Sequence, residues 1–180
     1  MGQSATLYRI AKTDFSKVEG NPDDFGLFKI NKSYETFEKT HEGLRCVLSK
    51  GQEANAAQLV EQIFYPKSFV GERIDYSKLD FDNLPENIDL LKEPVYFNEP
   101  SLVESISTLL GTISVEQFQK NFDPDELNKQ GVYPANVWNS RTELEYAFNV
   151  RDMTNEFLRL KGFYKLAKEG EDYILSYVGF

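Results

Sequence analysis

The sequence has very few of the residues from which disulfide frameworks, metal centres and histidine-based catalysis are built. Its 180 residues include one cysteine, one histidine, one tryptophan and two methionines. The single thiol, Cys46, cannot form an internal disulfide, and with no CxxC pattern beside it a reducing compartment is favoured. We therefore predict a cytoplasmic protein with no metal and no cofactor.

Positive charge and long apolar runs are also scarce. The chain has 20 lysine and arginine residues against 29 aspartate and glutamate residues, which gives a net charge of −9. Such a charge opposes binding to nucleic-acid phosphates and to anionic membranes. No stretch approaches the ~20 apolar residues that cross a bilayer, and no signal-peptide pattern is present. The sequence predicts a soluble protein that binds neither nucleic acid nor membrane.

Short catalytic motifs are missing as well. The chain contains no glycine-rich phosphate loop, no GxSxG and no HExxH. Residues 80–91 begin like a calcium-binding EF-hand loop, but Pro85 and Leu91 stand where that loop requires Gly and Glu. A solvated acidic loop is the better interpretation. These absences favour a protein that is not an enzyme, although carboxylates paired from separate elements would leave no local pattern.

Bulky apolar side chains are plentiful. The hydrophobic fraction is 41% and the aromatic fraction 14%, enough to fill one core in a chain of this length. No internal repeat or linker divides the sequence. We predict a single α+β domain over residues 1–180, in which a small mixed sheet of short strands packs against several helices, including one long C-terminal helix.

The hydrophobic spacing places the elements. Alternating patterns predict strands over residues 3–10, 94–97 and 173–177. Spacings of three and four predict helices over residues 13–18, 33–50, 53–64, 100–110, 115–122, 124–130 and 141–168. Residues 25–30 fit either a strand or a loop, and residues 67–91 are expected to form a surface loop with room for one short strand.

Helix-end signals support several of these boundaries. Ser114, Asp123 and Ser140 each precede a Glu or Gln by three residues, the spacing of a capping box. Asn98 and Gly111 are expected to begin and end the helix over residues 100–110.

His41 is the residue on which any histidine chemistry would depend. It lies on the apolar stripe of the predicted helix 33–50, so a core position is favoured. Glu42 is ~100° away and Cys46 ~140° away around a helix, which argues against the three acting on one substrate atom. Cys46 is interpreted as a small apolar filler among leucine and valine side chains.

Several strings occur in a characteristic order: KTHEGLRCVLS at 39–49, PVYF at 94–97, FDP at 122–124, VYPANVW at 132–138 and FYKLAKEG at 163–170. Together they resemble the YfbM-like family of bacterial proteins, domain of unknown function 1877. The resemblance implies a one-domain α+β fold and no established activity, and it suggests toxin–immunity gene neighbourhoods. The family's Trp-His pair is here His41-Glu42, and residues 65–93 are longer than the family pattern.

Two functions stay open. The first is a non-catalytic, immunity-like or inhibitor-like module that binds a basic protein partner, as the net charge favours. The alternative is a hydrolase or small-ligand protein with a pocket between the long helix and the sheet. The candidate pocket or recognition patch comprises Arg9, His41, Tyr96, Tyr133, Trp138 and Arg141. An aromatic group of Tyr96, Phe97, Tyr133, Trp138 and Tyr164 is expected to be core more readily than an exposed patch.

Overall fold

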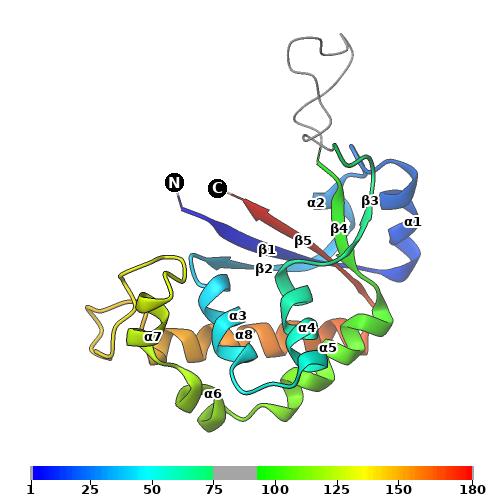
Figure 1. Ribbon diagram of the computed structural model, residues 1–180. Helices are drawn as coiled ribbons and strands as arrows, with labels where there is room; N and C mark the ends of the chain where they lie inside the picture. The colour runs from blue at the N-terminus through cyan, green and yellow to red at the C-terminus, as the bar shows by residue number, and fades with distance from the viewer. Residues whose placement is uncertain (1, 75–92, 180) are drawn as a thin grey trace, which may run out of the picture.

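An antiparallel sheet of five strands lies at the centre of the computed structural model, which describes residues 2–74 and 93–179 (Figure 1). The strand order is β2-β1-β5-β4-β3. The strands are β1 (Ser4–Ile10), β2 (Asn31–Glu38), β3 (Ser68–Val70), β4 (Val95–Asn98) and β5 (Tyr173–Gly179). Each neighbouring pair is antiparallel, so the expectation of a mixed sheet is wrong.

Helices cover both faces of this sheet, most of them on one side (Figure 1). The larger side carries α3 (His41–Ser49), α4 (Ala54–Phe64), α5 (Pro100–Thr112), α6 (Val115–Asn121), α7 (Pro124–Lys129) and α8 (Val150–Glu169). The other side carries α1 (Lys12–Gly20) and α2 (Leu27–Ile30). This arrangement confirms the α+β class and the long C-terminal helix.

The sheet divides the buried side chains into two clusters, because successive side chains of a strand point to opposite faces. Ala5, Leu7 and Ile174 join the larger cluster with the buried faces of α3 to α8. Ile10 and Leu175 join the smaller cluster with α1. A register shift between Arg9 and Ile10 marks the end of regular β1–β2 pairing.

The predicted helix over residues 33–50 is wrong in its first half. Residues 31–38 form β2, which pairs with β1 from Ser4↔Glu38 to Ile10↔Asn31. The spacing of Tyr34, Phe37 and His41 fits a helix, yet Phe37 is buried on the face that carries α3 to α8, while Tyr34 is 59% exposed. Tyrosine, threonine and phenylalanine also suit a strand, and pairing with a distant strand outweighed the local spacing.

The longest helix begins later than predicted. Residue 150 is its first residue, and Asn149 caps it by accepting hydrogen bonds from the backbone N–H groups of Arg151 and Asp152. The capping box at Ser140 is therefore not used. Phe148 has a φ of 58°, which no α-helix accommodates, so the chain from 140 to 149 is a loop.

The other helix-end expectations had different outcomes. Ser114 and Asp123 cap α6 and α7 by accepting from Gln117 and Glu126 backbone N–H groups, as predicted. The predicted cap Asn98 instead ends β4 and is buried, with its Nδ2 donating to the Gln62 carbonyl at 2.7 Å. α5 also runs past Gly111.

Residues 25–30 and 67–91 are the two segments for which the sequence left more than one structure open. The expectation of a strand or a loop over residues 25–30 is wrong for residues 27–30, which form the short helix α2. The short strand expected within 67–91 is β3. The EF-hand-like stretch at 80–91 lies outside the described residues. Within the two described ranges, no helix is long and apolar enough to cross a membrane.

Candidate functional site

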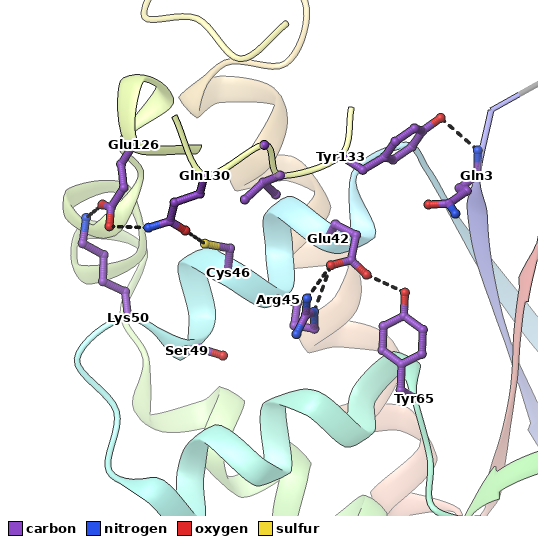
Figure 2. Close-up of a pocket in the computed structure, with 12 residues that line it drawn as sticks. Gln3, Glu42, Arg45, Cys46, Ser49, Lys50, Tyr65, Glu126, Gln130 and Tyr133 are labelled. Atoms are coloured by element: carbon purple, nitrogen blue, oxygen red, sulfur yellow. Dashed lines mark hydrogen bonds and ion pairs between the residues drawn. The ribbon is translucent and has the colours of Figure 1, made fainter. Parts of the chain in front are cut away.

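A polar cleft of about 780 Å³ opens between α3, α7 and the start of β1 (Figure 2). Its wall on α3 is formed by Glu42, Arg45, Cys46, Ser49 and the neighbouring Lys50. The opposite wall and the ends are contributed by Gln3, Tyr65, Glu126, Gln130, Gly131, Val132 and Tyr133. We call this the α3 cleft.

The α3 wall is fixed by a tight turn and by the single tryptophan. Lys39, with a φ of 60°, reverses the chain between β2 and α3. Trp138 packs directly on Gly43, where an added Cβ would lie 2.3 Å from the nearest ring carbon. The Trp138 Nε1–H donates to the Val132 carbonyl at 2.9 Å, so the ring also ties residue 132 to α3.

Glu42 and Arg45 lie at the centre of the polar contacts in the cleft. One carboxylate oxygen accepts hydrogen bonds from the Nε and Nη2 of Arg45 at 3.0 and 2.6 Å. The other accepts from the Tyr65 hydroxyl (Figure 2). Arg45 also donates to Glu61 at 2.6 Å, and its guanidinium lies 5.9 Å from the Tyr65 ring centroid. The network ties α3 to the C-terminal part of α4 and the residue that follows it.

These contacts keep each ionisable group in its usual charge state at neutral pH. Burial raises the pKa of Glu42, but hydrogen bonds from Tyr65 and Arg45 outweigh it, and the net pKa is lowered. Burial and the Glu42 carboxylate raise the pKa of Tyr65. Burial lowers the pKa of Arg45, yet the hydrogen bonds to Glu42 and Glu61 raise it overall. Glu42 therefore stays ionised, and Tyr65 stays protonated.

His41 lies one layer beneath the cleft. Its side chain is fully buried, and its ring packs edge-on against Phe64 at 5.8 Å. Neither ring nitrogen has a hydrogen-bond partner in the described structure. Burial lowers the pKa of His41, and the nearby Glu42 carboxylate opposes this shift only in part. The core position agrees with the sequence interpretation.

The expected separation of His41 from Glu42 is wrong. The His41 Nε2 lies 3.8 Å from a Glu42 carboxylate oxygen. The ~100° between adjacent helical residues describes where side chains leave the backbone, and the long Glu42 side chain spans that difference at the first turn of α3. Glu42 thus connects the buried imidazole to the cleft.

The far end of the cleft is closed by a second set of pairs. Lys50 and Glu126 form an ion pair at 2.5 Å. Gln130 donates from its Nε2 to Glu126 at 3.0 Å and accepts from the Cys46 thiol at 3.7 Å. Burial, followed by Glu126, raises the pKa of Cys46. The thiol therefore stays protonated, which disfavours a nucleophile.

A few polar groups between these two ends are available to a ligand. The Tyr133 hydroxyl accepts from the Gln3 backbone N–H at 2.9 Å, which leaves its own hydrogen free to donate (Figure 2). Within the described residues, the Ser49 hydroxyl and the Gln3 side-chain amide have no hydrogen-bond partner. The cleft can therefore supply both donors and acceptors.

The six predicted site residues do not meet in one place. Tyr133 lines the α3 cleft, His41 lies beneath it, and Tyr96 lines a neighbouring hollow. Trp138 is 3% exposed and belongs to the core. The aromatic group is likewise divided, since Tyr164 is fully buried while Tyr96 and Tyr133 are half-buried at different sites.

The two predicted arginines lie away from the cleft. Arg9 forms a 2.8 Å ion pair with Asp172, whose side chain is completely buried. Arg141 lies in the 140–149 loop, where it donates to the Tyr146 hydroxyl at 2.5 Å. The first contact stabilises the fold, and the second organises the loop.

The central cleft residues, Glu42, Arg45, Tyr65 and Glu126, were not predicted. The Glu42–Arg45 spacing of three residues is a signal for a helical ion pair. No local signal marks Tyr65 or Glu126 as members of the same site, since α4 and α7 bring them there. Within the described residues, no three His, Cys, Asp or Glu side chains gather as a metal site requires.

Comparisons with known proteins identify a family and a fold. The family model described as "Domain of unknown function (DUF1877)" matches residues 1–177. A crystal structure of YfbM from Escherichia coli, a protein of unknown function, is similar with a TM-score of 0.59 and 12% identity, over 98% of this chain and 99% of that chain. No curated protein matches. At this identity the structural likeness concerns the fold alone.

Proposed function

We propose that this chain, which belongs to the DUF1877 family, is a non-catalytic module that binds a basic protein partner, as an immunity protein or inhibitor would. The observation that carries the proposal is the mutual pairing of the charged groups in the α3 cleft. Glu42 is paired with Arg45, and Glu126 with Lys50. Such a cleft suits recognition by hydrogen bonds and ion pairs.

Catalysis would require the opposite shifts. A general base works best with a pKa raised towards neutrality, and a nucleophilic cysteine with a pKa that is lowered. Here the pKa of Glu42 is lowered and that of Cys46 is raised. The His41 imidazole is fully buried behind Glu42, so a molecule in the cleft cannot contact it directly. These features support binding over chemistry.

The net charge supports a basic partner. A charge of −9 attracts cationic surfaces over distances of about a Debye length, roughly 8 Å at physiological salt. At the cleft, Lys50 and Glu126 are 41% and 39% exposed, and exposed pairs of this kind contribute only about 0–1 kcal/mol. A partner lysine or arginine can therefore replace Lys50 at Glu126 at little cost.

The test is affinity purification of the tagged full-length chain from its native host in low salt. We expect a basic protein to be recovered, to be released by raised salt, and to be lost with Glu126→Gln. Glu169→Gln is the matched control, since this exposed glutamate at the end of α8 carries the same charge. Recovery of no partner, or equal recovery with both variants, would refute the proposal.

A second candidate is a small polar ligand in the same cleft. This cleft differs from the pocket expected between the long helix and the sheet, because none of the described residues that line it belongs to α8. Its volume of about 780 Å³ lies within the ~300–1,000 Å³ usual for small-molecule sites. The Tyr133 and Ser49 hydroxyls and the Gln3 amide would orient such a ligand. A metabolite mixture screened by ligand-observed NMR distinguishes the candidates, because a small-ligand site predicts binding that Tyr133→Phe weakens and that salt leaves unchanged.

A further inference from the structure

The central strand β5 is paired unequally along its two sides. On one side it pairs with β1 over its whole length, from Ile10↔Tyr173 to Ser4↔Gly179. On the other side its pairing with β4 stops at Tyr96↔Ser176. Beyond that point β4 continues to pair with β3, through Val95↔Val70, while it departs from β5 (Figure 1).

The departure leaves a wedge in the sheet. Pro94, immediately before β4, has no N–H with which to extend the ladder towards β5. Residues 177–179 of β5 therefore present a strand edge without a pairing strand in the described structure. A hollow of about 710 Å³ occupies this position, lined on one side by Ser176, Tyr177 and Val178 and on the other by Pro94 and Tyr96.

The floor of the wedge is anchored to β5. The Ser176 hydroxyl donates to the Phe64 carbonyl at 2.6 Å, which fixes the end of α4 against the strand. Tyr65 follows and separates the wedge from the α3 cleft, since it lines both. The wedge therefore has a strand edge, aromatic walls and a fixed base.

The charge of the wedge is opposite in sign to that of the protein. Among the residues that the structure describes, Lys67 and Arg73 line it together with a single acid, Glu93. In residues 2–74 and 93–179, neither Lys67 nor Arg73 forms an ion pair or hydrogen bond. Two unpaired cations beside one acid make this a local positive site on a chain whose net charge is −9.

We propose that this wedge binds an extended acidic peptide segment of another protein, which adds as a strand to residues 177–179 of β5. Main-chain hydrogen bonds to β5 supply affinity, as in other cases of strand addition. Alternate side chains of the segment face the Tyr65 and Tyr96 rings, and acidic side chains meet Lys67 and Arg73. The site goes beyond the proposed function, because it takes an acidic chain by its backbone and lies outside the α3 cleft.

The test uses two capped pentapeptides, Ac-Val-Glu-Val-Glu-Val-NH2 and Ac-Glu-Val-Glu-Val-Glu-NH2. Between them they place glutamate at either set of alternate positions, and neither carries a terminal carboxylate. They are titrated into the isotope-labelled full-length protein at physiological salt. We expect at least one to bind with a Kd below about 1 mM, the weak end of specific affinities. Its binding should slow hydrogen exchange of those amides in residues 177–179 that point towards the wedge, since the alternate amides face β1.

Two changes to the peptide separate backbone recognition from charge. Backbone N-methylation should weaken binding about tenfold or more, because it removes donors needed for the ladder. Replacing each Glu by Gln should weaken binding about three- to fivefold, as expected for exposed ion pairs.

Variants of the protein complete the test. Lys67→Gln and Arg73→Gln should each weaken binding by a similar three- to fivefold factor, about that of an exposed ion pair. Lys120→Gln, an exposed lysine on α6 far from the wedge, is the matched control and should leave the Kd unchanged. The proposal is overturned if neither peptide binds, if N-methylation has no effect, if the β5 amides are not protected, or if Lys120→Gln weakens binding equally.

Discussion

Replacing Gly43 by alanine tests how closely Trp138 packs on the backbone of α3. An added Cβ at this position would lie 2.3, 2.8 and 3.0 Å from three ring carbons of Trp138. The ring has little room to retreat. Its Nε1–H is bonded to Val132, and the Trp138 backbone N–H and carbonyl are both bonded to the Asn128 side chain, at 3.2 and 2.7 Å.

Two opposing effects set the magnitude. Alanine is favoured over glycine in a helix interior by at most ~1 kcal/mol, whereas overpacking a tight contact costs about 1–3 kcal/mol. We expect Gly43→Ala to lower the free energy of unfolding by about 1–2 kcal/mol. For a chain of this size the Tm should fall by roughly 2–8 °C.

The assay is urea and thermal unfolding followed by tryptophan fluorescence, since Trp138 is the only tryptophan and is buried. Gly162→Ala in α8 is the matched control. An added Cβ there has no atom within 4 Å, so it should raise stability by up to ~1 kcal/mol. If Gly43→Ala stabilises the protein as much as Gly162→Ala, the close contact with Trp138 is refuted.

Three further predictions concern buried or reactive groups. Asp172→Ala should lower the free energy of unfolding by about 3 kcal/mol, because it leaves the Arg9 charge largely buried and unpaired; a urea midpoint equal to wild type would contradict this. The pKa of His41 is lowered in the folded protein, so the neutral imidazole contributes its full stability above the unfolded pKa of about 6.5, and this stability is lost as pH falls below that value. His41→Leu should therefore show a weaker fall in the urea midpoint between about pH 7 and 5.5, and an unchanged fall would contradict the lowered pKa. The Cys46 thiol, whose pKa burial raises, should react with iodoacetamide at pH 8 more slowly in the folded protein than in urea, and equal rates would show that the thiol is not protected.

Local signals in the sequence were sufficient to predict a helix or strand where that element needs few contacts with distant residues. The caps at Ser114 and Asp123 act within one helical turn, and both helices begin where predicted. Strands β1 and β5 were also found, because alternation is strong where one face is buried. The β2 strand was missed because its two large side chains, Tyr34 and Phe37, are three residues apart. This spacing suits one face of a helix, but it also occurs in a strand whose two faces differ in burial.

The candidate site was only partly visible in the sequence. The core position of His41 followed from its place on an apolar stripe. Its 3.8 Å approach to Glu42, which lines the cleft, contradicts the separation expected from helix geometry. The Glu42–Tyr65 contact was not predictable, since residues 42 and 65 meet only after α3 and α4 pack together. Arg9 and Arg141 were expected to converge with His41 and Tyr133 in one pocket, but they bind Asp172 and Tyr146 away from the cleft.

Residue identities alone account for the acidic charge, the supply of apolar side chains for one core, the helix caps and the family strings. These properties depend on composition or on neighbours within a few positions. Packing of the folded chain selects which strands pair, where β4 leaves β5, and which charged groups meet in the α3 cleft. Those contacts join residues that are tens of positions apart in the sequence, so they stabilise the protein only once the sheet and helices have packed.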